Sequence, residues 1–321
     1  MFETVVRCNL CGGDRFERIH DHLEPTRFAG PGGTFQLVRC LGCDLVLLSP
    51  RPSREVMPEY YSRAFYASLS PEAAKGSRAP RLLTRSYLAL FPPPNRRRLS
   101  ACLRIVQALG PGEPGRLLDV GAGEGAFLEA MQHAGWQVSG TDVSPDAARM
   151  TARRLGISLL VGPFEELTIS GDEYDLVTFW DVLEHLHDPL GALRKARNLL
   201  RPGGKVLVSV PNLESLEARW LGQAWPHLDV PRHLTHFTAQ TLGRMLLEAG
   251  FDQVQTRTDS RLLTGNLLAG RLERHARTST RPGVRRAARV GGDVLRFLLR
   301  PTHIPLERAG LAQALVGVGQ A

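Results

Sequence analysis

The sequence contains no run of about 18 apolar residues, the length that a helix needs to cross a bilayer, so we expect no spanning helix. Its start, Met1 to Thr4, lacks the basic region and apolar stretch that are typical of a signal peptide. These two absences predict a cytoplasmic protein. Lysine is also scarce, because only Lys75, Lys195 and Lys205 occur, and the positive charge therefore rests on arginine.

That positive charge is unevenly distributed. From residue 271 onward ten Arg stand against three acidic residues, so nearly all of the formal net charge of +8 lies in this segment. Residues 1–270 are close to neutral. Nucleic-acid-binding proteins present basic surface to phosphates, so the near-neutral part argues against a nucleic-acid partner.

The C-terminal segment, residues 261–321, shows helical periodicity in pieces, with apolar residues between Val294 and Leu299 on one face and Arg296 and Arg300 beside them. This pattern predicts an Arg-rich helical tail. We interpret it as a solvated helical cap. The alternatives are peripheral contact with an anionic membrane surface and binding of an anionic group or partner.

Short apolar runs and helical patterns alternate regularly through residues 96–260. We predict strands at Arg116–Val120, Gln137–Thr141, Ser158–Val161, Tyr174–Trp180, Lys205–Val210 and Asp252–Thr258, and helices at Asn95–Leu109, Glu124–Ala134, Pro145–Leu155, Pro189–Leu200 and Thr238–Ala249. Such alternation predicts the α/β class, a Rossmann-like, doubly wound parallel sheet with helices on both faces. Before this domain we expect a small β-rich module over residues 1–50 and a helical linker over 51–95, with a helix from Arg54 to Ala67.

A glycine-rich turn joins the first of these strands to the next helix. Gly121, Gly123 and Gly125 follow Val120 with the spacing G-x-G-x-G, and glycine adopts positive φ without penalty. The free N–H groups of the helix start suit a carboxylate or phosphate. The dinucleotide pattern G-x-G-x-x-G is not met. Asp142 ends the second strand about 20 residues later, where a carboxylate can accept two hydrogen bonds from a ribose diol.

With these motifs, residues 95–258 resemble the class I S-adenosylmethionine-dependent methyltransferases, and most of all the small-molecule branch that includes the ubiquinone-pathway O-methyltransferases. The resemblance implies S-adenosylmethionine as cofactor. It also implies the following cofactor-binding residues: Asp119, Gly121, Ala122, Gly123 and Gly125 for the methionine part, Asp142 for the ribose, Val143 and Phe164 for the adenine, and Asp181 at the end of the fourth strand. Many relatives have Asp where this chain has Pro163, so we expect backbone or ring contacts of Phe164 to replace the carboxylate contact to the adenine amino group.

The segment after the fourth strand resembles the E-x-x-E-H pattern of the ubiquinone-type enzymes, with Asp181 in place of the first Glu. On a helix Asp181, Glu184 and His185 would share one face, which is suitable for a divalent cation such as Mg²⁺. The alternatives are helix capping by the D-x-x-E arrangement, lining of the cofactor pocket, and proton transfer by His185.

A second histidine cluster lies between Pro226 and Phe237, on the side that receives the methyl acceptor in this family. His233 is the first candidate for a general base, because sugar C-methyltransferases carry a His in a similar stretch and an imidazole can accept a hydroxyl proton. His185 and His236 are further catalytic candidates. Trp220 and Trp225 flank the cluster and would shield it from water. The alternative is that these side chains only fix the loop.

The first module contains Cys8, Cys11, Cys40 and Cys43 in two C-x-x-C pairs separated by 28 residues. This spacing is typical of a closed, structural zinc site with four thiolates, and two disulfides are the alternative. The module resembles the zinc-binding domain that precedes the catalytic domain in deoxysugar C-methyltransferases. It also resembles the zinc finger of ribosomal RNA guanine methyltransferases. We therefore expect a small zinc-ribbon-like module.

The combined patterns predict an S-adenosylmethionine-dependent methyltransferase that acts on oxygen or carbon of a small-molecule acceptor, such as a sugar, a secondary metabolite or a lipid-linked precursor. One alternative is an RNA methyltransferase. Such enzymes often carry the motif N-P-P-[YF] after the fourth strand, whereas this chain has Asp181-Val182-Leu183-Glu184 there, which argues against this alternative. The other is a non-catalytic protein that binds S-adenosylmethionine or a partner.

Overall fold

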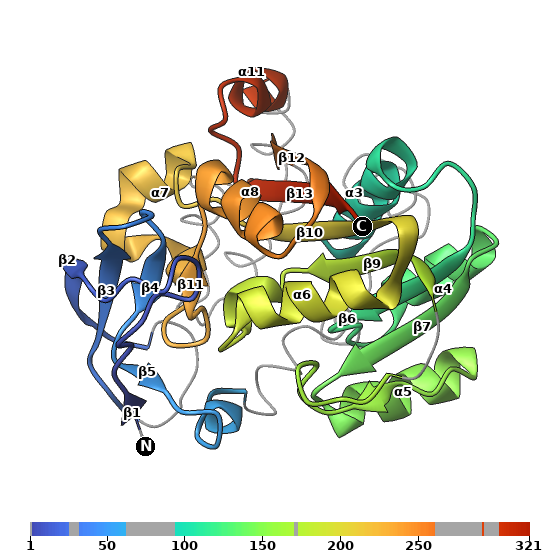
Figure 1. Cartoon of the computed structure of the whole chain (residues 1–321), viewed down its shortest axis with the longest axis horizontal. Helices are drawn as coiled ribbons and strands as arrows, with labels where there is room; N and C mark the ends of the chain where they lie inside the picture. The colour runs from blue at the N-terminus through green and yellow to red at the C-terminus, as the bar shows by residue number, and fades with distance from the viewer. Residues whose placement is uncertain (1, 26–31, 62–93, 170–172, 261–290, 292–301) are drawn as a thin grey trace.

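The computed structural model describes residues 2–25, 32–61, 94–169, 173–260, 291 and 302–321. Among these residues one large sheet has the strand order β12-β13-β10-β9-β6-β7-β8 (Figure 1). Its strands are β6 (Arg116–Val120), β7 (Gln137–Asp142), β8 (Leu160–Val161), β9 (Tyr174–Trp180), β10 (Leu200–Pro211), β12 (Asp252–Asp259) and β13 (Ala314–Gln320). The helices around it are α3 (Pro94–Leu109), α4 (Ala126–His133), α5 (Pro145–Leu155), α6 (Pro189–Leu199) and α8 (Ala239–Glu248).

The strands from β10 to β8 run parallel, and the central strands β6 and β9 are buried on both faces. Successive side chains of a strand point to opposite faces, so Leu117 packs with residues of α3 and α4 while Leu118 packs with residues of α6 and α8. Both leucines are fully buried. Strands covered on both sides are apolar throughout, which is why they were recognisable in the sequence. The expected α/β sheet with helices on both faces is confirmed.

The C-terminal residues lie inside this sheet, so the prediction of a helical tail over 261–321 is wrong for 314–320. Strand β13 pairs antiparallel with β10 on one side and β12 on the other, and the sheet is therefore mixed rather than purely parallel. The strand approaches its neighbours closely, because a Cβ on Gly317 would lie 2.9 Å from Leu246 Cδ1 and one on Gly319 would lie 2.7 Å from Phe251 Cβ. A short apolar run cannot be assigned to helix or strand from periodicity alone.

Other predictions for the linker and tail are tested only in part. The predicted helix that starts at Arg54 is described as far as Tyr61, and there it is a 3-10 turn, η1 (Met57–Tyr60). In the tail, the helix α11 (His303–Arg308) is described. The rest of the linker and the apolar face from Val294 to Leu299, on which the alternative of membrane contact rests, lie outside the described residues. Within the described ranges no helix is both long and apolar enough to cross a membrane.

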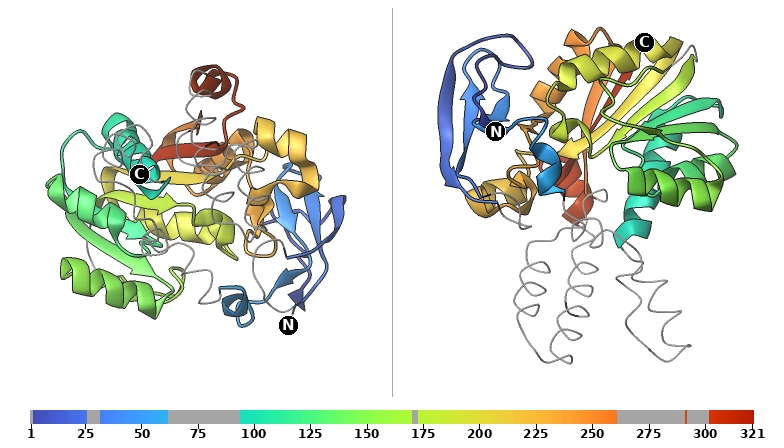
Figure 2. Two further views of the ribbon diagram at one scale, coloured as in Figure 1. Left: turned by 180° about the vertical axis from the view of Figure 1, so that it is seen from behind. Right: turned by 90° about the horizontal axis from the view of Figure 1, so that it is seen from below.

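The N-terminal module forms a second, antiparallel sheet beside the first (Figures 1 and 2). Its strands are β2 (Phe16–Leu23), β3 (Phe35–Cys40) and β4 (Val46–Leu48), while β1 (Phe2–Glu3) pairs with β5 (Arg51–Pro52). The outer neighbour of β4 is β11 (Thr235–His236), which comes from the second histidine cluster. The module is therefore continuous with a distant part of the chain rather than separate from it.

The position of β13 gives a stability prediction. The substitution Leu315→Ala should lower the free energy of unfolding by about 3 kcal/mol, because it leaves a cavity between the sheet and α8. Leu247→Ala is the matched control, since Leu247 is 58% exposed, and should cost less than about 0.5 kcal/mol. Urea unfolding followed by circular dichroism measures both, and equal losses would contradict the buried position of β13.

Candidate active site

The glycine turn lies at the C-terminal end of β6, where ligands bind in open α/β sheets. Gly121 and Gly123 have φ of +73° and +56°, a region that favours glycine. A Cβ on Gly121 would also lie 2.5 Å from Val182 Cγ2, so the close approach of these two segments requires glycine. The N–H groups of Gly121 and Ala122 each donate to the Thr141 carbonyl at 2.9 Å, which fixes the turn against β7.

Asp142 holds this turn from the end of β7. Its Oδ2 accepts from the Gly123 N–H at 2.8 Å, and its Oδ1 accepts from the Ser144 N–H at 2.8 Å. Burial raises the pKa of Asp142, and the two N–H donors oppose that rise. Each carboxylate oxygen keeps a further lone pair, so the side chain can accept ribose hydroxyls without releasing the turn. Val143 beside it is 60% exposed and offers an apolar surface.

Asp119 lies in β6, just before the glycine turn, where it is buried and accepts a hydrogen bond from Thr178 Oγ1 at 2.7 Å. Burial raises the pKa of Asp119 to about 7, although the Thr178 hydroxyl and Arg98 act in the opposite direction. The side chain is thus poised between its neutral and charged forms near neutral pH. A positive ligand group at this position would favour the charged form.

Arg98 is a site residue that the sequence reasoning missed. It projects from α3 and pairs with Asp181, with 2.8 Å between Nη2 and Oδ2, and it also donates to the Trp180 carbonyl at 2.9 Å. Ser209 Oγ donates to Asp181 Oδ1 at 3.1 Å. No motif marks Arg98, because it comes from a helix that precedes the sheet and reaches the strand ends only after folding.

The adenine end of the predicted site differs from expectation at Phe164. Its ring is buried and packs edge-on against Phe179, with 5.7 Å between the ring centroids. Its carbonyl accepts from Lys195 Nζ at 2.5 Å. The ring therefore belongs to the core beneath the loop, which does not support a contact between the ring and adenine, and the alternative contact through the Phe164 backbone stays a prediction.

The residues after β9 form the short 3-10 helix η3 (Leu183–His185), so the i, i+3, i+4 face expected of an α-helix does not exist. Its N-cap is Val182, which has no side-chain cap, and the capping alternative is therefore also wrong. The predicted Mg²⁺ group of Asp181, Glu184 and His185 is not assembled. The group whose ligand atoms lie within 4.8 Å of one another contains His233 in place of Asp181.

Backbone carbonyls lie against the ring nitrogens of the candidate histidines. His185 Nδ1 lies 3.0 Å from both the Arg232 carbonyl oxygen and the Tyr61 hydroxyl, which can donate or accept. His233 Nδ1 lies 2.8 Å from the His227 carbonyl oxygen, and because a carbonyl only accepts, the neutral His233 ring carries its proton on Nδ1 and keeps a lone pair on Nε2. The two rings lie 4.6 Å apart. His236 has the opposite arrangement, with Nε2 at 3.1 Å from the Leu228 carbonyl oxygen.

The electrostatics keep this cluster uncharged. Burial lowers the pKa of His233 well below its usual value, assisted by His185 and His236, and burial lowers the pKa of His236 to about 4. Burial also lowers the pKa of His185. Glu184 is fully buried, and neither carboxyl oxygen has a hydrogen-bond partner among the described residues; burial, followed by the nearby Asp181, raises its pKa well above its usual value. The cluster offers neutral imidazole lone pairs that can accept a proton.

The two tryptophans beside the cluster differ from each other. Trp225 is buried against the N-terminal module, and its shielding of the site stays a prediction. Trp220 is 75% exposed and shields nothing within the described chain, so that part of the prediction is wrong.

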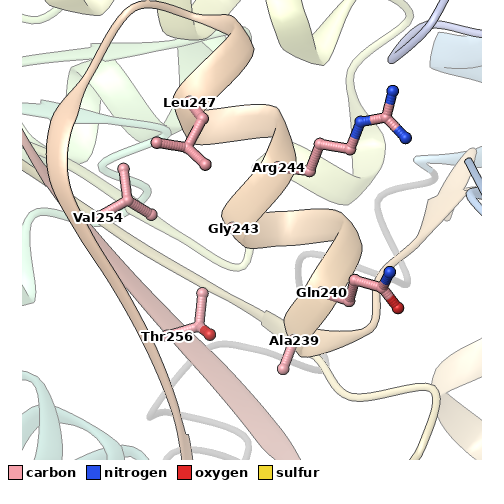
Figure 3. A pocket seen from close by; sticks show the side chains of 7 residues that line it. All are labelled: Ala239, Gln240, Gly243, Arg244, Leu247, Val254 and Thr256. Atoms are coloured by element: carbon pink, nitrogen blue, oxygen red, sulfur yellow. The ribbon is translucent and has the colours of Figure 1, made fainter.

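A shallow groove lies elsewhere, between α8 and β12 (Figure 3), and Arg244 is the sole charged residue among those that line it.

The four predicted cysteine ligands come together. The Sγ atoms of Cys8 and Cys43 lie 3.4 Å apart, those of Cys11 and Cys40 lie 3.5 Å apart, and all four lie within 4.8 Å of one another. Zinc bound tetrahedrally with Zn–S bonds of about 2.3 Å needs sulfur atoms about 3.8 Å apart, so the residues fit the ion. Burial raises the pKa of Cys8 to about 11, a cost that a bound cation would offset. All four cysteines are free thiols, which contradicts the disulfide alternative.

Comparison with known proteins agrees with this geometry. Residues 95–256 match the model of the methyltransferase domain family, so the chain belongs to that family and the expected class I S-adenosylmethionine-dependent methyltransferase domain is confirmed. A ubiquinone biosynthesis O-methyltransferase of Cereibacter sphaeroides is 32% identical over 163 residues, which are 47% of this chain and 66% of that protein. The enzyme of the same description from Aeromonas salmonicida is 37% identical over 103 residues, which are 30% of this chain and 43% of that protein.

Among solved structures, a SAM-dependent methyltransferase from Archaeoglobus fulgidus is 18% identical, with a TM-score of 0.48, and the match covers 75% of this chain and all of that one. The chain spans just under two thirds of the first curated relative that it matches.

The cysteine geometry predicts the metal content. The purified protein should hold about one zinc ion per chain, and Cys43→Ser should lower that content to below about 0.2 because a closed site needs all four thiolates. Cys102→Ala is the matched control, since Cys102 is a buried thiol outside the group. Elemental analysis by plasma mass spectrometry measures the ratio. Equal zinc in the Cys43 and Cys102 variants would contradict the assignment.

Proposed function

We propose that this protein transfers a methyl group from S-adenosylmethionine to a small-molecule acceptor. The observation that carries the proposal is the glycine turn at the end of β6, which Asp142 fastens through the Gly123 N–H. The turn brings backbone N–H groups, a carboxylate and the start of α4 to one edge of the sheet. The ubiquinone O-methyltransferases among the relatives support an acceptor of small size.

The predicted cofactor residues can be given roles in this arrangement. We assign the ribose hydroxyls to Asp142, the adenine to the apolar surface at Val143, and the methionine part to the turn from Asp119 to Gly123. The sulfonium of the bound cofactor supplies an already activated methyl group, so the protein has mainly to hold and align the acceptor. Arg98 is the cationic side chain near this site, and its positive charge is paired with the carboxylate of Asp181.

The acceptor side is assigned to the histidine cluster. His233 is the proposed general base, because its neutral Nε2 keeps a lone pair while Nδ1 is held by the His227 carbonyl. Asp229 Oδ2 lies 3.7 Å from that Nε2 and is itself paired with Arg232, so a proton taken up by His233 would gain a nearby carboxylate. The acceptor hydroxyl or carbon acid loses its proton to Nε2 as the methyl group moves.

The cofactor assignment is tested by calorimetric titration with S-adenosylmethionine. The protein should bind one equivalent, and Asp142→Ala should weaken binding at least about tenfold, because it removes the ribose acceptor and the tie to Gly123. Asp146→Ala is the matched control, since Asp146 is an exposed acid on α5 near the same edge. Its affinity should stay within about twofold of the native value. Absence of binding by the native protein would overturn the proposal.

The general base is tested by methyl transfer from labelled cofactor to a panel of phenols, sugars and lipid-linked precursors. With any acceptor that is turned over, His233→Ala should lower kcat about 100-fold without changing cofactor affinity. The exposed His133 provides the control His133→Ala, which should keep native turnover. Because burial lowers the pKa of His233, the base stays neutral above that pKa, and the acid limb of the kcat profile should lie below pH 6.5. Unchanged kcat in His233→Ala would exclude it as the base.

A further inference from the structure

The four-cysteine module is joined to the second histidine cluster by backbone pairing. Strand β4 begins shortly after Cys43, and β11 pairs with it antiparallel, so that Thr235 lies opposite Leu47 and His236 opposite Val46. The Leu48 N–H adds a hydrogen bond of 3.0 Å to the Leu234 carbonyl. The segment that carries His233 and His236 is therefore an edge strand of the module's own sheet.

A second link reaches the segment that carries Glu184 and His185. Asn9, which lies between the first two cysteines, donates from Nδ2 to the His187 carbonyl at 2.9 Å. Arg51 Nη1 donates to the same carbonyl at 3.2 Å. His187 Nε2 lies 2.9 Å from the Pro52 carbonyl oxygen. Both histidine segments, although about 40 residues apart in sequence, thus form hydrogen bonds with the same module.

Side-chain packing follows the same route. On one face of the module's sheet, Cys40, Cys43 and Leu47 share a buried cluster with Leu183 and with residues of the larger sheet. On the other face, the module's Phe35, Leu37 and Leu48 pack with the loop residues Trp225, Leu228 and Leu234. A displacement of the two cysteine turns would therefore also displace the histidine segments, because close-packed side chains connect them continuously.

The cofactor side has weaker links to the module. Leu118 and Val120 of β6 share the buried cluster that contains Cys40 and Cys43, but no described backbone hydrogen bond joins the glycine turn to the module. The hydrogen bonds described for Gly121, Gly123 and Asp142 go to β7, to α5 and to Gly162 after β8. Arg54 reaches Glu165 and Glu166 near the adenine end, but these ion pairs are 3.6 and 3.5 Å long and partly exposed, so they contribute little.

We propose that a metal ion on the four cysteines positions the histidine cluster, so that loss of the ion disorders the acceptor side and leaves the cofactor side intact. The ion would join two turns separated by 28 residues in sequence, which otherwise meet through the thiols, a hydrogen bond of 3.0 Å from the Leu41 N–H to the Arg15 carbonyl and the pairing of Phe16 with Cys40. Without the ion, the two cysteine turns are no longer held together, so β4 and Asn9 lose their fixed positions. Their hydrogen-bond partners, β11 and the His187 carbonyl, then lose their support as well. The consequence for methyl transfer rests on the proposed function, whereas the positioning itself does not.

Hydrogen exchange of the full chain, read by mass spectrometry before and after zinc chelation, tests the coupling. Exchange in residues 183–188 and 226–237 should rise at least tenfold; Asp181 and Val182 are left out because they contact Arg98 and Gly121 on the cofactor side. Exchange in residues 116–125 should change less than twofold, calorimetric affinity for S-adenosylmethionine should stay within twofold, and added zinc should restore all values. Unchanged exchange in 226–237, or an equal rise in 116–125, would overturn the proposal.

Two variants separate positioning from general loss of the module. Asn9→Ala removes the bond to His187 and should raise exchange in 183–188 several-fold while zinc content stays native. Leu41→Ala is the matched control, because Leu41 lies between the second pair of cysteines and is 53% exposed. Native exchange in both variants would contradict the role of Asn9. These readings need no acceptor and no turnover, so they stand or fall separately from the proposed activity.

Discussion

The active-site half of this molecule depends on the carboxylate of Asp142. With one oxygen it accepts from the Gly123 N–H, and with the other it accepts from the Ser144 N–H at the start of α5. Three elements of the fold, the turn after β6, the end of β7 and the start of α5, therefore meet at a single side chain. A buried N–H without a partner is costly, so the carboxylate stabilises the positive-φ turn while it also presents the oxygens that we propose bind the ribose.

Burial sets the charges around this edge of the sheet. It raises the pKa of the carboxyls Asp119 and Glu184, and it lowers the pKa of the imidazoles His233 and His236. Both shifts favour the neutral form, because a low-dielectric environment disfavours any unpaired charge. Where charge persists, it is paired, as in Arg98 with Asp181 and Arg232 with Asp229. A neutral, preorganised cluster suits a reaction in which a cationic methyl donor supplies the driving force.

The N-terminal module changes the relation between structure and catalysis in this chain. A zinc-binding appendage would stabilise itself and leave the catalytic domain alone. Here β11 extends the module's sheet, and Trp225 packs against its face. The residues proposed to receive the acceptor are thus supported by one sheet, and the residues proposed to receive the cofactor are supported by the other. This division lets the two halves of the site respond differently to loss of the metal.

Local features were predictable from the sequence because their causes are local. Ser144 and Pro145 predicted the start of α5, and the Ser144 side chain indeed accepts from the Ala147 N–H. The spacing of the glycines predicted the turn, and the C-x-x-C pairs predicted four clustered thiols. Strand β9 was predicted at its observed bounds, since a short, mostly apolar run within a regular alternation of strands and helices is typical of a strand buried on both faces.

Long-range features were not predictable, because they depend on which segments meet. The sequence by itself determined the glycine turn, Asp142, the thiol group and the alternation of strands and helices. Only the tertiary structure placed β13 between β12 and β10, brought Arg98 to Asp181, replaced Asp181 by His233 beside Glu184, and joined β11 to β4. Pairing between distant strands and between distant side chains is decided by packing, and periodicity within one segment carries no information about it.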